Sequence, residues 1–461
     1  MVDNRTRDIE GILLIYYWLK DMGYPVVLSN QINWKDKCFL HNPSVVVLSS
    51  AITVYGSVYG AFLDFLTRYS KIAILPQEGA IPKKDCMNAL FTGKFEHDVA
   101  YTKGVSRIFM WGDQTRQWIE EENIFNPSQT MVTGTPRFDA LMLEREEGGR
   151  AEKHIGFATS HTHINCYTFA NRSDNFMTHL DYRKDSSNGV ENYYSQDRHW
   201  EDWIWYNCAA FRYECELIKR CAVDLKAAIS LRPAPFELVE GYNFFKDKYK
   251  NFESRNDYYL SEWVKDIFCM IVYVSTVAVS ALAYGVPVIS PLKLLGERLY
   301  DHIKLDQLIS PYFSRFFHFP QNLDEALDMI RSAKAGELPA LPEGKKDDLG
   351  RYLKSYYDFP RQEPSSLTIA RELGRLAEEA SRELAPVLEP NVLKNIFYRR
   401  ARALLKDPYH IAMNIKNGSF KSMQRYHFYP WHLADFIKTR DIWRKLRSRY
   451  IGAEGLIKQN G

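Results

Sequence analysis

The sequence predicts an α/β protein in which two Rossmann-like domains face a cleft and a basic helical tail follows them. Three observations predict this architecture. Short apolar strands alternate with helical stretches over residues 1–150, the alternation restarts at His154, and the positive charge is concentrated near the C-terminal end. Strands alternating with helices are typical of a parallel sheet covered on both faces. At 461 residues the chain is also too long for a single hydrophobic core.

The N-terminal half is predicted to begin with a helix, because five apolar or aromatic residues fall on one helical face and Gly23 follows them as a stop. These residues are Ile9, Ile12, Leu13, Tyr16 and Tyr17. Buried strands are expected at residues 26–28, 45–48, 73–75, 108–111 and 131–133, and helices near residues 59–69 and 114–122.

The second half repeats the pattern. Strands are expected at residues 155–158, 228–231, 270–274 and 286–289, and helices at residues 203–225 and 277–284. Between the first of these strands and its helix lies a long polar stretch, residues 160–202, rich in Asn, Ser and Tyr. An excursion of this length inside a compact domain is either functional or disordered. Its aromatic residues favour a loop that lines a cleft.

The segments divide the chain into four parts. We expect an N-terminal Rossmann-like domain over residues 1–150 and a second one over residues 151–332. Residues 333–390 are predicted to be a linker and a crossover helix, because Gly and Pro are frequent up to residue 347 and Pro364-Ser365-Ser366 is typical of a helix start. Residues 391–461 form the basic tail.

Composition and missing motifs exclude several classes of protein. We expect neither a transmembrane helix nor a signal peptide, because the sequence has no run of about 18 uncharged apolar residues and Met1–Glu10 is charged. Its seven cysteines form no CxxC pair, which fits a reducing cytoplasm and argues against a zinc site. The sequence lacks Asp-x-Asp, GxGxxG, the P-loop and GxSxG. We therefore expect no metal and no dinucleotide cofactor.

The tail is predicted to lie on an anionic membrane surface. From Lys394 to Gly461 it carries 15 Lys or Arg against four Asp or Glu, whereas the whole chain has a net charge of +3. Aromatic and aliphatic residues recur among these cations, as in interfacial helices. The alternative is a pair of helices packed on the body with a basic outer face. No nucleic-acid-binding fold accompanies the charge, so no nucleic-acid partner is expected.

Two segments after predicted strands are candidates for binding a phosphate. Ser275 and Thr276 stand between a strand and a helix, where backbone N–H groups, hydroxyls and the helix dipole favour an anion. Arg232 ends another strand, in Arg-Pro-Ala-Pro-Phe-Glu, and its guanidinium suits a phosphate or a carboxylate. The alternatives are that Ser275 only caps the helix and that Arg232 is structural and pairs with Glu237 or with an acid between the domains.

Two further strand ends carry polar residues. Glu78 follows a strand in Gln-Glu-Gly, the position of a catalytic carboxylate in an α/β domain, although it could equally be an acid at a helix start. In Thr133-Gly134-Thr135-Pro136 a turn is expected to cross between the domains. Arg137 and Asp139, just after it, line the cleft or pair with each other.

Several of these motifs together resemble a known family. The opening Val2–Gly11, Gln77-Glu78-Gly79, Val132–Asp139 and Arg232–Glu237 resemble, in this order, bacterial surface carbohydrate biosynthesis proteins related to the retaining β-Kdo glycosyltransferases. The resemblance implies the GT-B architecture, with CMP-Kdo bound by the second domain and a glycan acceptor by the first. Kdo is an eight-carbon acidic sugar. It also implies a cytoplasmic enzyme at the inner face of the membrane that builds lipopolysaccharide or capsule.

The resemblance assigns roles, and the sequence departs from the family at two of them. Ala234 stands where the family has His, and Ser280 where the helix after the Ser/Thr turn often has Glu for the ribose. Ala234 is therefore an engineered or natural loss of a donor, or a native Ala whose donor comes from His161 or His163. Arg232, Ser275 and Thr276 would hold the phosphate.

The retaining route also needs a base and a nucleophile. Glu78 is our candidate acid/base and Asp202 our candidate nucleophile, although Asp202 could equally be an acid at a helix start. Three other functions stay open. They are a polyol-phosphate transferase, a nucleotide-sugar 2-epimerase and a non-catalytic membrane-bound assembly factor.

Overall fold

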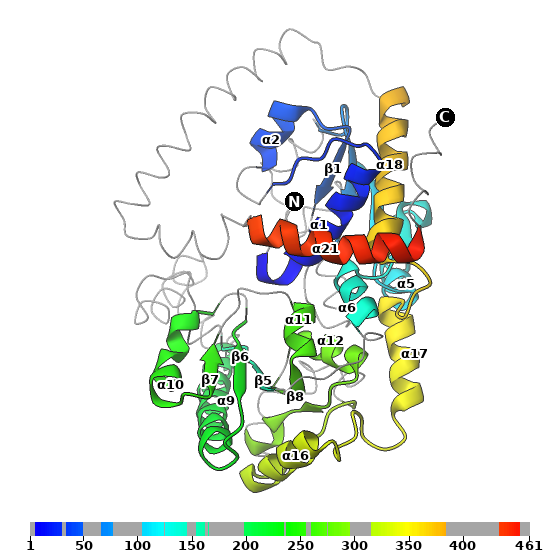
Figure 1. The fold of residues 1–461 in the computed structure, drawn as a ribbon. Coiled ribbons are helices and arrows are strands. Elements are labelled where there is room, and N and C mark those ends of the chain that lie inside the picture. Colours follow the sequence, from blue (N-terminus) through cyan, green and yellow to red (C-terminus); the bar gives the residue numbers. More distant parts are fainter. Residues whose placement is uncertain are drawn as a thin grey trace. The chain divides into compact units, whose positions relative to one another are not determined.

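The computed structural model describes residues 5–29, 34–48, 66–76, 104–123, 125–144, 154–161, 165, 198–234, 237–254, 260–273, 275–295, 315–383 and 433–451. The chain forms two compact units, shown in Figure 1. Unit 1 combines residues 1–146 with residues 350–461, and unit 2 comprises residues 147–349. Each unit has its own sheet.

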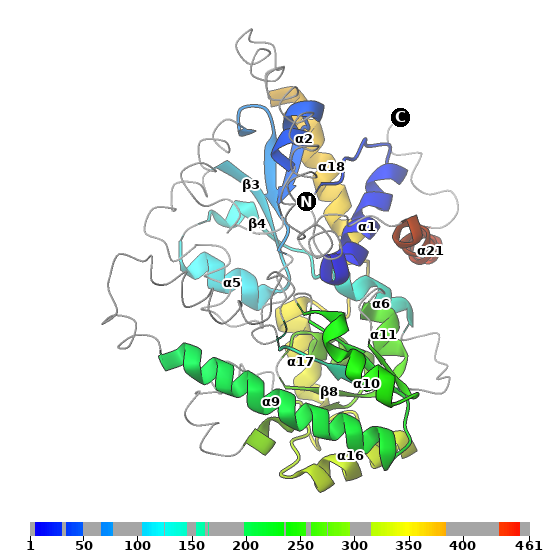
Figure 2. The same cartoon turned by 90° about the vertical axis from the view of Figure 1, so that its left-hand side faces the viewer.

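The sheet of unit 1 is parallel, in the order β1-β2-β3-β4. Its strands are β1 (Val45–Leu48), β2 (Lys71–Ile74), β3 (Val105–Met110) and β4 (Thr130–Val132). Helix α18 (Ser365–Glu383) packs on β1 and β2, and α5 (Asp113–Glu121) packs on β3 and β4 (Figure 2). The apolar side chains of α18 recur at helical spacing and are buried, which is why this late segment returns to cover the first sheet.

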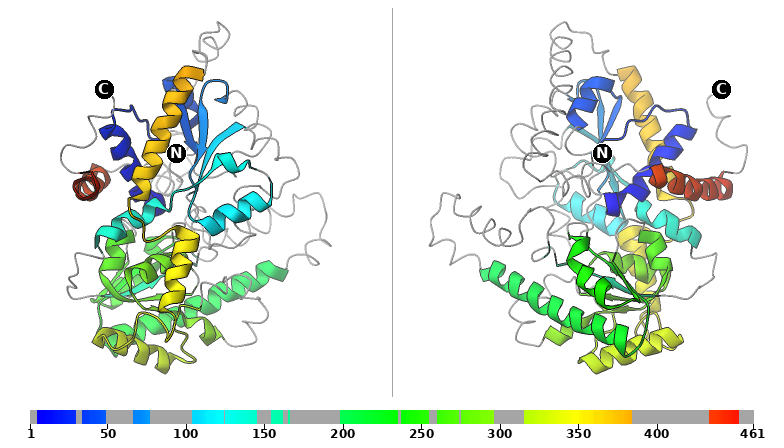
Figure 3. Two further views of the ribbon diagram at one scale, coloured as in Figure 1. Left: turned by 90° about the vertical axis from the view of Figure 1, so that its right-hand side faces the viewer. Right: turned by 60° about the vertical axis from the view of Figure 1, so that its left-hand side comes forward.

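Further helices complete unit 1. Helix α1 (Arg5–Asp21) lies beside α18 and α21 (Leu433–Tyr450), as Figure 3 shows. The indole of Trp18 donates to Ser366 Oγ at 3.0 Å. The unit also contains α2 (Trp34–His41), two short 3₁₀ helices, α6 (Asp139–Glu144) and α17 (Lys346–Tyr357). The 3₁₀ helices are η3 (Pro127–Gln129) and η4 (Pro136–Phe138).

Tail helix α21 packs on α1 through its aromatic residues. Trp443 stacks on Tyr17 with ring centroids 5.6 Å apart, and the Tyr17 hydroxyl donates to the Phe436 carbonyl at 2.6 Å. Arg447 pairs with Asp21 at 2.8 Å. Leu446 is fully buried, whereas Ile437 is 44% exposed. The part of the tail that the structure describes thus uses most of its apolar side chains for packing.

The sheet of unit 2 is also parallel, in the order β7-β6-β5-β8-β9. Its strands are β5 (His154–Ala158), β6 (Ile229–Arg232), β7 (Phe252–Ser254), β8 (Ile267–Val272) and β9 (Val288–Ile289). The chain starts in the middle at β5, moves to one edge through β6 and β7, and then crosses to β8 and β9 on the other side. This is the doubly wound topology of a Rossmann-like domain.

Both faces of this sheet are covered. Side chains of α9 (Arg198–Val223), α10 (Asn243–Lys248) and α16 (Leu323–Ala335) share one apolar cluster with Phe157 and Leu231 from the strands. The opposite face meets α11 (Leu260–Lys265), whose Trp263 donates to Ser230 Oγ at 3.1 Å. Helix α12 (Val277–Tyr284) packs on α11, β8 and β9. Two short 3₁₀ helices, η5 (Val239–Tyr242) and η6 (Pro291–Leu295), follow β6 and β9.

The predicted α/β class with two parallel sheets is confirmed, and most expected strands lie within a few residues of their predicted places. Three expectations about local structure were wrong. Residues 26–28 form no strand, because Val27 is 47% exposed and the segment is an extended connection. Strand β7 was missed. The turn Thr133–Pro136 does not cross between domains, since it and the following helix α6 belong to unit 1.

The expected helix near residues 59–69 lies mostly outside the described residues, as do most of the polar stretch 160–202 and the first part of the tail. Among the helices that the structure does describe, we find none that combines the length and the apolarity needed to span a membrane.

Candidate functional site

The topology of unit 2 identifies its own binding edge. Strands β5 and β8 are neighbours, but the connections that leave them run to opposite sides of the sheet. In doubly wound sheets ligands bind at such a switch point, outside the carboxyl ends of the strands. Three segments emerge there. Their described residues are 159–161 after β5, 233, 234 and 237 after β6, and 273, 275 and 276 after β8.

Glu237 ties two of these segments together. Its Oε2 accepts hydrogen bonds from Thr159 Oγ1 at 2.7 Å and from the Tyr242 hydroxyl at 2.6 Å. Its Oε1 accepts from the backbone N–H of His161 at 2.5 Å. The carboxyl group is fully buried, and burial raises its pKa, although the charge of His161 and these hydrogen bonds act in the opposite direction. Glu237 therefore fixes the loop after β5 against the loop after β6.

His161 is held from its other side by helix α9. Its Nε2 lies 3.2 Å from Glu214 Oε2, and both side chains are almost completely buried. Burial lowers the pKa of His161, but the charges of Glu214 and Glu237 outweigh it, so the pKa is raised overall. The raised pKa extends the protonated form of the imidazole, in which both ring nitrogens are donors, to higher pH than in a free histidine.

Two tyrosines border the network that His161, Glu214 and Glu237 form. The ring of Tyr273, just after β8, lies 6.4 Å from the ring of His161 and 6.4 Å from that of Tyr206 on α9. Burial, followed by the charge of Glu214, raises the pKa of Tyr273 well above its usual value. Tyr206, Ala210 and Glu214 recur every fourth residue along α9 and are all buried. One stripe of α9 thus faces the carboxyl ends of β5 and β8.

Arg232 and Ala234 lie at this edge. Arg232 is the last residue of β6 and is 8% exposed, and its carbonyl accepts from the Thr159 N–H at 3.2 Å. Ala234 follows two residues later and is half-buried, with its carbonyl accepting from the Glu237 N–H at 2.9 Å. These two backbone hydrogen bonds hold Ala234 close to Glu237 and Arg232 beside the residues that follow β5.

Ser275 and Thr276 lie where β8 gives way to α12. Thr276 occupies the N-cap position, and its side chain makes no capping hydrogen bond. Ser275 Oγ lies 3.4 Å from the Val277 N–H, a long contact for a cap. Ser280 is the fourth residue of α12 and is buried, with 4% of its surface exposed. Arg232, Ser275 and Thr276 thus emerge at the same edge of one sheet.

The remaining candidates are placed differently. Glu78 and His163 lie outside the described residues. Asp202 lies in the second turn of α9 and not at its start, because the helix begins at Arg198, and its side chain is outside the description. Asp139 accepts hydrogen bonds from the Ser365 and Ser366 N–H groups at 2.8 and 2.7 Å, so it caps α18 within unit 1.

Sequence reasoning missed the residues that organise this edge. Thr159, Tyr242 and Tyr273 were not singled out, and Glu237 was considered only as a partner of Arg232. Glu214 was also missed. Its spacing from Tyr206 and Ala210 could have identified it, because an acid on the apolar stripe of a helix is rarely buried without a partner.

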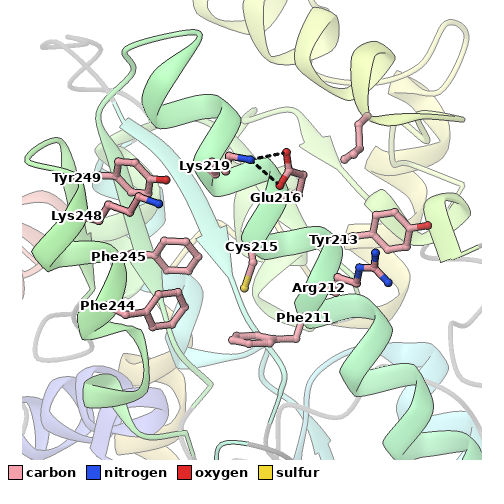
Figure 4. Close-up of a pocket in the computed structure, with 11 residues that line it drawn as sticks. Phe211, Arg212, Tyr213, Cys215, Glu216, Lys219, Phe244, Phe245, Lys248 and Tyr249 are labelled. Carbon is pink, nitrogen blue, oxygen red and sulfur yellow. Dashed lines mark hydrogen bonds and ion pairs between the residues drawn. The ribbon is translucent and has the colours of Figure 1, made fainter.

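A pocket of about 610 Å³ adjoins the network on the side of α9 and α10 (Figure 4). Aromatic rings from both helices line it, with cations at its rim and Lys219 bound to Glu216. The pocket meets the buried network at Phe211, whose ring centroid lies 5.4 Å from that of His161. Elsewhere in the described residues, no group of three or more His, Cys, Asp or Glu side chains is arranged to hold a metal ion.

Comparison with known proteins finds similar folds. No protein-family model and no curated protein matches the chain. A UDP-GlcNAc 2-epimerase from Methanocaldococcus jannaschii is 13% identical with a TM-score of 0.44, over 81% of this chain and 98% of the other. The S. aureus MnaA–UDP structure is 9% identical with a TM-score of 0.43, over 84% and 98%. The wall teichoic acid polymerase TagF is 11% identical with a TM-score of 0.38, over 73% and 74%.

Proposed function

We propose that the chain is a retaining glycosyltransferase that moves Kdo from CMP-Kdo to a glycan acceptor of the bacterial surface. The observation that carries the proposal is the edge of the unit 2 sheet. There Arg232, the last residue of β6, and Ser275 and Thr276, before α12, lie around the switch point between β5 and β8. The sequence resemblance of the Arg232–Glu237 motif adds the identity of the donor.

Departure of CMP from the donor needs little help from a general acid. When the bond between the anomeric carbon and the phosphate oxygen breaks, its electron pair goes to the phosphate of CMP, which leaves as an anion. The protein must stabilise that anion with preorganised donors. Arg232, Ser275 and Thr276 would supply them. Glu78 would remove the proton from the acceptor hydroxyl, and Asp202 would be the nucleophile of the retaining route.

The tail supports a place at the inner face of the cytoplasmic membrane. Within α21 the aromatic residues pack on α1, but Arg444, Lys445 and Arg449 are exposed. Each cation near an anionic lipid surface contributes about 1 kcal/mol. We therefore propose attachment by charge, with an acceptor that is lipid-linked.

A thermal-shift panel with CMP, UDP and CDP-glycerol tests the donor class. At about 100 times its Kd a ligand stabilises the folded state by roughly 2.7 kcal/mol. For a unit of about 200 residues this corresponds to roughly 5–10 °C. We expect CMP to give the shift and Arg232→Ala to reduce it. A shift with UDP alone would favour an epimerase, and one with CDP-glycerol alone a polyol-phosphate transferase.

A further inference from the structure

Three buried polar atoms at the switch point lack hydrogen-bond partners among the described residues. They are Nδ1 of His161, Oε1 of Glu214 and the hydroxyl of Tyr273. The three side chains are only 1–3% exposed. Leaving a buried donor or acceptor unsatisfied costs about 1–3 kcal/mol for each group. Such groups are uncommon in folded proteins, and several in one place indicate a function.

The three groups belong to one cluster. His161 Nε2 contacts Glu214 Oε2 at 3.2 Å, and the rings of His161 and Tyr273 are 6.4 Å apart. Each comes from a different element, namely the loop after β5, helix α9 and the segment after β8. Glu237 locks the His161 backbone, and Glu214 fixes the imidazole from α9. The cluster is therefore preorganised and stands at the edge where the fold binds ligands.

The donors and acceptors of the cluster define its ligand. Glu214 Oε1 can only accept, His161 Nδ1 donates when the ring is protonated, and the Tyr273 hydroxyl can do both. Glu214 contacts the imidazole of His161 and Glu237 accepts from its backbone N–H, so two carboxylates lie beside one histidine and their charge disfavours a phosphate or a carboxylate. A hydroxyl group donates one hydrogen bond and accepts others, which matches the set.

We infer that His161, Glu214 and Tyr273 form a site for the hydroxyl groups of the activated donor, beside the phosphate held by Arg232, Ser275 and Thr276. The inference rests on the proposed function. The hydroxyls come from the ribose of the nucleotide or from the transferred sugar. In either case the carboxylate of Glu214 and the phenol of Tyr273 bind the neutral part of the donor, and Arg232 binds its anionic part.

Tyr273→Phe is the sharpest variant, because it removes a hydroxyl that has no partner in the described residues. A purely structural Tyr273 predicts no change in ligand binding. Our inference predicts an unchanged or higher melting temperature for the free protein and weaker binding of the ligand. Glu214→Gln keeps the size of the side chain and removes the charge. Ser230→Ala, which deletes a bonded hydroxyl on the opposite face of β6, is the matched control.

The assay compares ligand pairs by calorimetry on the full chain. CMP against 2′,3′-dideoxy-CMP reports the ribose hydroxyls, and CMP-Kdo against CMP reports the sugar. We expect the wild-type protein to prefer the hydroxylated member of one pair by roughly 10- to 100-fold, the effect of a hydrogen bond to a charged group. Tyr273→Phe and Glu214→Gln should each lose most of that preference, and Ser230→Ala should keep it.

The outcomes separate this inference from the proposed function. If CMP binds but both variants keep the wild-type preference in both pairs, the hydroxyl site is refuted and the donor class stands. UDP against 2′,3′-dideoxy-UDP and UDP-GlcNAc against UDP are measured in parallel. A preference that appears only in the UDP pairs and is lost in both variants supports the site and refutes CMP-Kdo as donor. If none of these nucleotides binds, both proposals fail.

Discussion

Replacing Glu237 tests whether one carboxylate holds the binding edge of unit 2 together. Glu237→Ala leaves three buried donors without their acceptor, namely the His161 N–H and the hydroxyls of Thr159 and Tyr242. Each orphaned group costs about 1–3 kcal/mol, and the two hydroxyls recover part of it by rotating. We therefore expect Glu237→Ala to destabilise the β5 loop by about 3–5 kcal/mol, comparable to breaking a buried ion pair.

Glu237→Gln should behave differently, because of which oxygen serves which donor. The His161 N–H can only donate, and it binds Oε1. Thr159 and Tyr242 both bind Oε2, and both are hydroxyls that can accept as well as donate. A glutamine with its carbonyl oxygen toward His161 and its NH₂ toward the hydroxyls therefore satisfies the whole set. We expect a cost of only about 1 kcal/mol.

Hydrogen exchange at the His161 amide measures this directly, since that amide is the donor to Glu237. A cost of 3–5 kcal/mol corresponds to exchange roughly 10²- to 10⁴-fold faster in Glu237→Ala, if the loop opens locally. Glu237→Gln should change it by less than about tenfold. The exposed Glu240, replaced by Ala, is the control. Equal acceleration in the Gln and Ala variants would show that the charge, not the hydrogen-bond geometry, holds the loop.

Four further outcomes are expected. Glu78→Gln should lower turnover strongly with CMP affinity unchanged, and a near-normal rate of sugar transfer would remove it from the mechanism. Ala234→His should raise sugar transfer by about 10²-fold if the added imidazole moves a proton; no gain in rate or CMP affinity would place residue 234 outside the site. Burial raises the pKa of Asp139 to about 6 from 3.8, so its stabilising contribution is present below about pH 4 and lost as the pH rises to about 6. The difference in unfolding free energy between wild type and Asp139→Asn should change by about 3 kcal/mol over that window, and a flat difference would contradict the shift. Replacing Arg444, Lys445 and Arg449 with Gln should weaken binding to anionic liposomes roughly 100-fold, and unaltered flotation would exclude α21 as the attachment.

The strands of both sheets could be predicted because a buried parallel strand is an apolar run. Ile267–Val272 is buried at every position, and its signal is clear. Strand β7 was missed because it lacks this apolar run: only Phe252 of its three residues is apolar and buried. The prediction for residues 26–28 was wrong in the opposite way, because a strand was expected there and none forms. Their apolar residues match a strand, but residues 26–28 belong to neither sheet of the described residues, and Val27 is exposed.

The position of the phosphate candidates could be predicted, because a polar residue at the end of a strand or shortly after it lies at the carboxyl edge of the sheet. Arg232, Ser275 and Thr276 all follow this rule. This rule does not find hydrogen-bond partners that belong to another helix or strand. Glu214 lies 53 residues after His161 in sequence, and only the packing of α9 brings the two together. Asp139 was misplaced for the same reason, since its partners Ser365 and Ser366 lie more than 220 residues away.

The length of α9 nevertheless indicates that Glu214 lies at the carboxyl edge of the sheet. Its 26 residues extend roughly 39 Å, whereas β5, with five residues, covers roughly 17 Å. A helix this much longer than the strand it follows must project beyond one edge of the sheet, as Figure 2 shows. Its last turns pack on the strands through Leu217, Ile218 and Cys221. The projecting end of α9 therefore lies at the carboxyl edge, and its buried stripe Tyr206–Ala210–Glu214 borders that edge. A buried acid on that stripe needs a hydrogen-bond partner, and Glu214 has one oxygen on His161 while its other oxygen has no partner among the described residues.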